Sequence, residues 1–193
     1  MPAESIKDFD QWSETYEDSI AQRWYFDRIH TRTLDLIGTG QSPESVLDVG
    51  CGTGRFLRKI KSRWPSASLS GIDPAEGMIT KARLYLPGAS FVVGSAESLP
   101  FPDASFDLVI STVSFHHWAD QEKAFREINR VLREGGTFAL ADVANSRFLS
   151  LFLRHGRMRT PGEQEHLFTR TGFKVSLQKW IMIGHILTIG LKA

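Results

Sequence analysis

Short apolar segments alternate with amphipathic segments along most of the chain, and this alternation constrains the fold more than any other feature. ESVLDVG (44–50) is an apolar run that ends in glycine, and SLSGID (68–73) is a second run that ends in aspartate. Strands that alternate with helices form crossover units, which build a parallel sheet covered by helices on both faces. The sequence therefore predicts an α/β fold with a doubly wound, Rossmann-like sheet of about seven strands.

The C-terminal part breaks this alternation. A short turn near Gly184 separates the last two predicted strands, and so short a connection can join only antiparallel strands. We therefore expect one antiparallel strand at the C-terminal hairpin. The expected strands are 44–50, 68–73, 90–94, 106–115, 137–142, 173–180 and 185–193, and the expected helices are 19–37, 54–64, 75–86, 120–133 and 161–171.

Local signals fix some boundaries of these elements. Glu134-Gly135-Gly136 is expected to end helix 120–133, since glycine terminates helices. Helix 19–37 is expected to bury Trp24 and Ile29 on one face. Residues 1–43 are expected to form an N-terminal cap segment and this helix, and residues 44–193 to form the ligand-binding part of what is a single domain overall.

Composition excludes several classes of protein. The single cysteine, Cys51, rules out an intramolecular disulfide framework, and no metal site is expected. The formal net charge of +1 gives no reason to expect nucleic acid as a partner. No apolar stretch approaches the roughly 20 residues of a membrane-spanning helix. The N-terminus has no run of signal-peptide type, so a cytoplasmic location is expected. The oligomeric state is left open.

The segment VLDVGCGTG (46–54) leads from a predicted strand into a predicted helix through Gly50, Gly52 and Gly54. A backbone that turns this tightly favours glycine, and the missing side chains let a ligand approach the main chain. The next helix directs free N–H groups at the same place. Ligands of doubly wound sheets bind beyond the carboxyl ends of the strands, where the strand order reverses. The alternative is a tight turn without a ligand.

Two acids near this turn indicate the ligand. Asp73 ends the second strand 23 residues after Gly50, where Rossmann proteins hold ribose hydroxyls; the alternative is a turn or capping aspartate. Asp48 lies two residues before the first glycine, where it would repel a pyrophosphate and suit a cation. Arg55 also takes the place of the third glycine of the dinucleotide motif. This pattern favours S-adenosylmethionine (SAM) over NAD.

Three segments together resemble the class I SAM-dependent methyltransferases, nearest to the small-molecule branch that includes ubiquinone and menaquinone biosynthesis. They are VLDVGCGTGRF (46–56), GIDPAEGMI (71–79) and GSAESLPFPDASFDLVISTVSFHHW (94–118). The similarity extends from residue 46 to about residue 142. FDQWSETYED (9–18) also resembles the N-terminal cap segment of that branch. The resemblance implies a SAM-binding methyltransferase domain at 44–193 and methyl transfer to a small-molecule acceptor.

The resemblance also implies roles for individual residues in holding the cofactor. Asp48, Gly50, Cys51 and Gly52 would line the methionine part, Gly54 would allow the tight entry into the helix, and Asp73 would hold the ribose. Pro74 and Met78 would press on the adenine, Ala96 and Glu97 would lie along its edge, Ser111 would offer its carbonyl to the methionine ammonium, and Tyr16 would close over the cofactor. Ser95 stands where the family commonly has an acid, so a weaker hydrogen bond to the adenine is expected there.

Methyl transfer is an in-line displacement in which the cofactor supplies the reactive group and the protein aligns the partners. His116 and His117 follow the fourth strand and could take a proton from the acceptor. At most one should face the substrate, because adjacent extended residues point in opposite directions. The alternative is that a histidine packs or caps the next helix. Asp142 could orient the substrate or cap the exit of the fifth strand.

The segment 144–160 contains four arginines, including Arg154, and no acid. It is expected to emerge over the ligand edge and to pair with the acidic residues of 1–18 as a lid over the acceptor; the alternative is a solvated helix face. Arg154 is therefore a candidate substrate residue. The acceptor molecule and the methylated atom are left open.

Two other functions remain open from the sequence. If the chain is an NAD-dependent oxidoreductase, it should bind a nicotinamide cofactor. If it is a non-catalytic SAM-binding module, it should bind SAM without turning over any acceptor. A nucleic-acid methyltransferase is disfavoured, since no basic stripe with interleaved aromatic residues appears outside 147–159.

Overall fold

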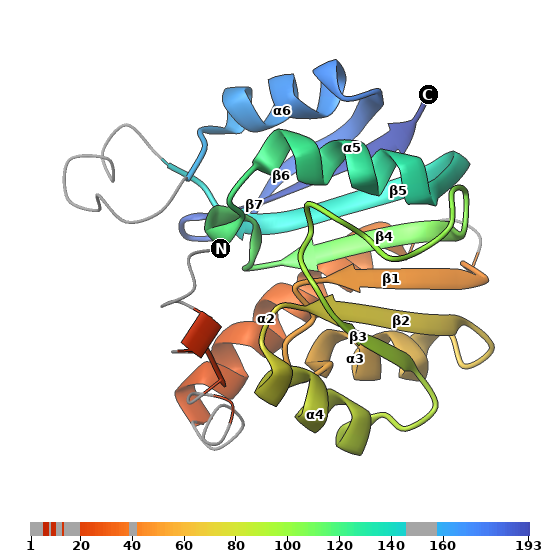
Figure 1. Cartoon of the computed structure of the whole chain (residues 1–193). Helices are drawn as coiled ribbons and strands as arrows, with labels where there is room; N and C mark the ends of the chain where they lie inside the picture. The colour runs from red at the N-terminus through yellow and green to blue at the C-terminus, as the bar shows by residue number, and fades with distance from the viewer. Residues whose placement is uncertain (1–5, 8, 11–12, 14–19, 39–41, 146–157) are drawn as a thin grey trace.

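The computed structural model describes residues 6–7, 9–10, 13, 20–38, 42–145 and 158–193. These residues form a three-layer α/β arrangement with one seven-stranded sheet in the order β3-β2-β1-β4-β5-β7-β6 (Figure 1). The strands are β1 (Ser45–Val49), β2 (Ser68–Asp73), β3 (Ser90–Val93), β4 (Phe106–Thr112), β5 (Leu132–Val143), β6 (Phe173–Met182) and β7 (His185–Lys192).

The direction of the strands confirms the predicted topology. β1 to β5 pair in parallel, whereas β7 runs antiparallel to both of its neighbours, β5 and β6. Gly184 lies in the turn between β6 and β7 with a φ of 74°. The sheet is thus doubly wound with one reversed strand, which confirms the Rossmann-like fold expected from the alternation.

Helices cover both faces of the sheet (Figure 1). One face packs against α2, α3 and α4, and the other against α5 and α6. The helices are α2 (Ile20–Ile37), α3 (Arg55–Arg63), α4 (Glu76–Tyr85), α5 (Gln121–Val131) and α6 (Pro161–Arg170), with a short 3₁₀ helix, η1 (Phe115–His117), after β4.

Local sequence explains why the helices begin where they do. The Asp120 side chain accepts from the backbone N–H of Lys123, 3.0 Å away, and so caps α5. α6 begins with a capping box between Thr160 and Glu163 and has Pro161 in its first turn. α3 buries Phe56, Leu57 and Ile60, whose spacing places them on one face of the helix.

The start of β5 differs from the sequence expectation. α5 ends at Val131, and β5 begins at the next residue instead of at 137. Its register with β4 passes from Phe106↔Leu132 to Leu108↔Thr137, so 133–136 bulge out opposite Asp107. The two glycines in this segment therefore form a strand bulge, where Gly135 has a φ of 71°, and do not end the helix.

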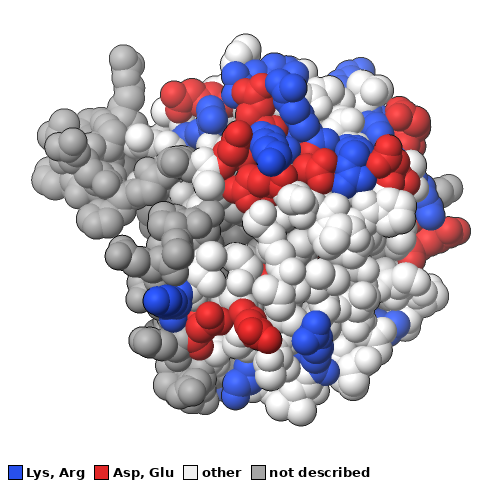
Figure 2. All heavy atoms as spheres, viewed as in Figure 1, with Lys and Arg blue, Asp and Glu red and all other residues white. Residues whose placement is uncertain are grey.

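The face formed by α5 and α6 carries cations and carboxylates side by side (Figure 2). Arg126 and Arg170 both pair with Glu122, and Arg130 pairs with Glu127 and Asp103. Within the described part of the chain, none of the helices has the length and apolar character needed to cross a membrane.

Candidate cofactor and acceptor site

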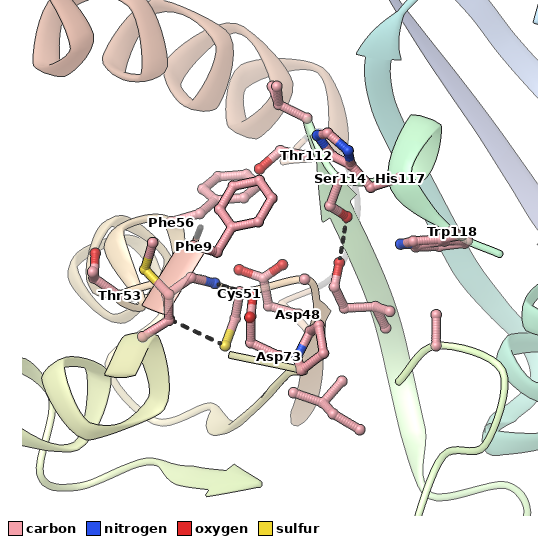
Figure 3. A pocket seen from close by; sticks show the side chains of 18 of the residues that line it. Phe9, Asp48, Cys51, Thr53, Phe56, Asp73, Thr112, Ser114, His117 and Trp118 are labelled. Carbon is pink, nitrogen blue, oxygen red and sulfur yellow. Dashed lines mark hydrogen bonds between the residues drawn. The ribbon is translucent and has the colours of Figure 1, made fainter. Parts of the chain in front are cut away.

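A cavity that opens to solvent lies at the carboxyl ends of β1, β2 and β4. The strand order reverses between β1 and β4, so the cavity occupies the crevice where ligands of doubly wound sheets bind. Its lining residues come from the turn after β1, the ends of β2 and β4, the segment after β3, α2, α3 and the N-terminal turn around Phe9 (Figure 3).

The glycine turn has the geometry that only glycine adopts readily. Gly50, Gly52 and Gly54 have φ values of 78°, 52° and 72°. A Cβ on Gly50 would lie 2.3 Å from the Ser114 Oγ, whereas a Cβ on Gly52 would meet nothing within 4 Å. The turn therefore packs tightly against β4 on one side and leaves open space beside Gly52, where a ligand can approach the backbone.

Asp73 fastens this turn to the end of β2. One carboxylate oxygen accepts from the N–H of Gly52 and the other from the N–H of Ala75, each at 2.9 Å. The pKa of Asp73 is raised to about 6, mainly by burial; these two hydrogen bonds oppose the rise, and the nearby charge of Asp10 adds to it. The carboxylate thus lines the cavity in the position expected for a ribose acceptor, with its backbone contacts fixing its orientation.

Asp48 is the most deeply buried acid that lines the cavity. Its side chain is 1% exposed, and its Oδ1 has no hydrogen-bond partner among the described residues. Burial, and then the charge of Asp73, raise the pKa of Asp48 to about 8. A buried carboxylate without a partner is costly, and a cation beside it removes that cost. The site therefore fits the positively charged methionine end of SAM.

The opposite side of the cavity has an apolar floor and a polar edge. Pro74, Met78 and Ala96 line it, and Met78 and Ala96 are nearly fully buried. Glu97 accepts from the N–H groups of Ala119 and Asp120, at 2.7 and 3.2 Å. Burial opposes the ionised form of Glu97, but these backbone hydrogen bonds and one from Ser95 together lower its pKa. Ser95 and Glu97 therefore share one polar edge of the cavity.

Aromatic side chains, including Trp118, dominate the rest of the cavity wall. Phe26 and His30 come from α2 and Phe56 from α3, with the His30 and Phe56 rings stacked at 4.6 Å. Phe9 reaches the cavity from the N-terminal turn and meets the His117 ring edge-on at 5.3 Å.

Trp24 of α2 does not belong to this wall. It was expected to be buried, but it is 60% exposed and lies beneath the Arg28 guanidinium.

The N-terminal turn is fastened to the start of α4. The Asp10 carboxylate accepts from the N–H of Gly77 at 2.9 Å, so it caps a helix whose own N-cap residue, Ala75, provides no side-chain cap. A Cβ on Gly77 would lie 2.6 Å from the Ser13 Oγ, so glycine allows this close approach. This contact places Phe9 against the cavity.

The two histidines after β4 have different surroundings. His117 lines the cavity, and burial, together with the nearby His116, lowers the pKa of His117 to about 4. His116 is not among the residues that line the cavity; its Nδ1 lies 2.6 Å from the Oδ1 of Asp142. A carboxylate only accepts, so the Nδ1 of His116 donates this hydrogen bond.

Asp142 organises this corner of the site. It is fully buried, and it accepts from the backbone N–H groups of Phe115 and Val143 at 2.7 and 2.6 Å as well as from His116. These hydrogen bonds join the end of β5 to η1. Asp142 therefore fixes the turn that carries both histidines and does not itself line the cavity.

The structure thus places the candidate residues in three groups. Those that line the cavity are Asp48, Gly50, Cys51, Gly52, Asp73, Pro74, Met78, Ser95, Ala96, Glu97 and His117. Those that lie beside it are Gly54, which approaches Phe91, Ser111, whose hydroxyl bonds to that of Ser114, and the His116–Asp142 pair. Tyr16, Arg154 and most of the expected lid (144–160) and cap segment (9–18) lie outside the described residues.

In the described part of the chain, no group of three or more histidine, cysteine or acidic side chains is placed so that it could hold a metal ion. The candidate site therefore depends on a glycine turn, two buried acids and an aromatic wall.

The fold and this site define a Rossmann-like protein that holds a nucleoside with a cationic end. Comparison with known proteins gives the family. Residues 47–140 match a family described as a methyltransferase domain. Malonyl-(acyl-carrier protein) O-methyltransferase of Dechloromonas aromatica is 32% identical over 190 residues, which cover 92% of this chain and 68% of that protein. The chain belongs to the class I SAM-dependent methyltransferases, and SAM is its cofactor.

Other similarities extend this result. Demethylmenaquinone methyltransferase of Thermotoga maritima is 31% identical over 137 residues, covering 70% of this chain and 59% of that protein. The methyltransferase in a solved complex with the Haloferax volcanii Trm112 methyltransferase activator shares the fold, with a TM-score of 0.81 and 24% identity over 95% of this chain and 97% of that one. The chain spans 42% to 61% of the length of three curated methyltransferase relatives.

Proposed function

We propose that this chain transfers a methyl group from SAM to a small-molecule acceptor. The observation that carries the proposal is the buried carboxylate of Asp48, which has an oxygen without a partner among the described residues and faces a glycine-lined cavity. A positively charged ligand stabilises the ionised form of Asp48, whereas a pyrophosphate would disfavour that form further. This contrast favours SAM over a nicotinamide dinucleotide.

The proposed cofactor contacts follow the three parts of the ligand. Asp48, with the backbone of Gly50, Cys51 and Gly52, holds the methionine end, and Asp73 holds the ribose hydroxyls. Pro74, Met78 and Ala96 enclose the adenine, and Ser95 and Glu97 bound its edge. Their positions on the cavity wall support these roles. Gly54 and Ser111 support the turn from outside the cavity, and Tyr16 is proposed as a cap.

SAM supplies an electrophilic methyl group when it is bound. The protein's contribution is then to align the acceptor and to exclude water, which the aromatic wall of Phe9, Phe26, Phe56 and Trp118 favours. We propose that His116, oriented by Asp142, receives the proton of a hydroxyl or acidic carbon acceptor at Nε2. His117, whose pKa is low, is proposed as a neutral contact for the acceptor.

The acceptor is proposed to be small and mostly apolar or aromatic. The relatives named above act on a malonyl-acyl-carrier protein and on a demethylmenaquinone, so their names support a methyl acceptor without selecting one. Intermixed charges on the α5 and α6 face offer no continuous basic surface there, which supports an acceptor other than nucleic acid (Figure 2). Asp142 and Arg154 are proposed to act near the acceptor, and a cytoplasmic location is proposed.

Formation of S-adenosylhomocysteine tests this function. The protein is incubated with SAM and a panel of phenols, quinols and carboxylic acids, and the product is quantified by mass spectrometry. We expect acceptor-dependent product with at least one panel member, and a loss of about 100-fold in His116→Gln because general-base catalysis is removed. His166→Gln, at an exposed position on α6, is the control. SAM binding without product on any acceptor would instead support a non-catalytic binding module.

A further inference from the structure

Val113 has a backbone conformation that valine rarely adopts. Its φ is 54°, in the left-handed region, where a β-branched residue is an outlier. Among the residues that the structure describes, Ala104 is the only other non-glycine residue with a positive φ, and it lies exposed in the turn before β4. Glycine adopts this conformation without strain. A valine at this position therefore indicates that its side chain has a role that glycine could not fill.

Hydrogen bonds on both sides of Val113 maintain this conformation. The Val113 N–H donates to the Ala141 carbonyl at 2.9 Å, so the pairing of β4 with β5 continues one residue past the end of β4. The next side chain, Ser114, donates to the Val49 carbonyl at the end of β1, at 3.1 Å. The chain is thus fastened to both neighbouring strands at the point where it leaves the sheet, and these contacts hold Val113 in place.

The Val113 side chain lies at the wall of the cavity. It lines the cavity together with its two neighbours, Thr112 and Ser114 (Figure 3). It is partly buried, and it packs against the core cluster that contains Ile29 of α2 and Phe56 of α3. Val113 therefore adjoins the aromatic wall on the side of α2 and α3, where the acceptor is proposed to bind.

A side chain of this kind is suited to limit the size of a ligand. Valine is stiff about χ1, because two carbon atoms branch from its Cβ. Its backbone is held by hydrogen bonds to β1 and β5, so the side chain cannot move aside without disturbing the sheet. Apolar pockets distinguish ligands that differ by one methylene group by about 10- to 200-fold. Val113 thus combines contact with the cavity, stiffness and a fixed position.

We propose that Val113 is a specificity-determining residue that limits the size of the apolar substituent an acceptor can place against the wall formed by α2 and α3. The inference rests on the proposed function and adds to it a steric limit, which admits a compact substituent and excludes a bulky branched one. A smaller residue at this position should widen the range of acceptors, and a larger residue should narrow it, while SAM binding stays the same.

Pairs of acceptors that differ only in bulk test this limit. The pairs are the para-methyl and para-tert-butyl forms of phenol and of benzoic acid, and methylhydroquinone with tert-butylhydroquinone. The kcat/KM of each is measured at saturating SAM from the formation of S-adenosylhomocysteine. We expect the wild-type protein to prefer the methyl member. This preference should fall by about 10- to 100-fold in Val113→Gly and rise by about 10-fold in Val113→Ile. SAM affinity, measured by calorimetry, should change less than about threefold in both.

Ala104→Gly is the matched control, because it replaces the other non-glycine residue with a positive φ at an exposed position outside the cavity. It should keep the wild-type preference. Thermal unfolding shows that each variant is folded, and Val113→Ile serves if Val113→Gly is not.

Two results would overturn the inference and leave the proposed function intact. One is an unchanged preference in the folded Val113 variants. The other is an equal loss of kcat/KM for both members of each pair, which would confine the role of Val113 to shaping the turn. Absence of product from every acceptor, in the wild-type protein and in the variants, would overturn both the inference and the proposed function.

Discussion

The two ends of the cavity are built in different ways. The cofactor end is formed mainly by one continuous turn, Gly50 to Gly54, with the carboxylates of Asp48 and Asp73 around it. The proposed acceptor end is assembled from side chains of distant segments: Phe9 from the N-terminal turn, Phe26 from α2 and His117 from η1. One end uses backbone and charge, whereas the other uses aromatic rings and His117.

This difference indicates a division of labour. The glycine turn at the cofactor end should tolerate few substitutions, because each of its glycines has a positive φ that most other residues rarely adopt. An acceptor end made of side chains can change its shape by substitution without disturbing the sheet. We therefore expect variants at the two ends to separate cofactor binding from turnover.

The largest expected effect concerns pH and Asp48. The pKa of this buried group is raised from 3.8 to about 8, so the folded protein keeps a proton that the unfolded chain releases. Its contribution therefore makes the free energy of unfolding fall as the pH rises from about 4 to about 8, by at most about 1.4 kcal/mol per pH unit. Urea denaturation at several pH values should show that Asp48→Asn is more stable relative to wild type as the pH rises. Parallel curves for the two proteins across this window would contradict the assignment.

The second prediction concerns the glycine turn. In Gly50→Ala, the new Cβ clashes with Ser114, whose hydroxyl is held by the Val49 carbonyl at 3.1 Å and by Ser111 at 2.8 Å. Strain at positive φ and this clash should together lower the free energy of unfolding by about 2–5 kcal/mol. Gly135→Ala is the control, because its φ is also positive but a Cβ would meet nothing within 4 Å. It should cost only about 1 kcal/mol, and equal losses in both variants would show that the clash has no effect.

The third prediction separates the two ends. Asp142→Asn keeps an oxygen that can accept from the Phe115 N–H, but its amide cannot replace the carboxylate that fixes the His116 tautomer. Turnover should fall by about 100-fold, while SAM affinity changes less than about twofold because Asp142 lies outside the cavity. Steady-state kinetics and calorimetry measure the two quantities. A comparable loss of SAM affinity would mean that the ends are not independent.

The smallest expected effect concerns the N-terminal turn. Asp10→Ala and Asp120→Ala each remove the acceptor at a helix start and should each cost about 1 kcal/mol of stability. Only Asp10→Ala should also speed the dissociation of SAM, since Asp10 places Phe9 against the cavity. Stopped-flow measurement of SAM release compares the two variants. Equal release rates would confine the role of Asp10 to capping α4.

The sequence predicted the sheet and the position of the glycine turn well because the information for both is local. The alternation of strands and helices predicted the sheet and its reversed strand, and the motif 46–54 located the turn. It could not predict that Phe9, Phe26 and His30 share a wall, because that contact depends on how α2 and the N-terminal turn pack. Nor could it separate His116 from His117, because their difference comes from Asp142 at the end of another strand.

The bulge in β5 shows the same limit on a smaller scale. Two consecutive glycines favour a helix end, yet pairing between β4 and β5 extends past them as far as Leu132. The start of β5 was therefore determined by its pairing with β4 and not by the local preference of the two glycines. The exposed Trp24 is a further case, since the helical period fits more than one face of α2.

Calorimetric titration with SAM and, separately, with NADH tests the central claim most directly, with Asp73→Ala as the comparison protein. The account predicts saturable binding of SAM, no binding of NADH, and SAM binding that is about 10- to 100-fold weaker when the ribose acceptor is removed. Folded wild-type protein that binds NADH and not SAM would contradict it, because Asp48 and the glycine turn would then serve a different ligand.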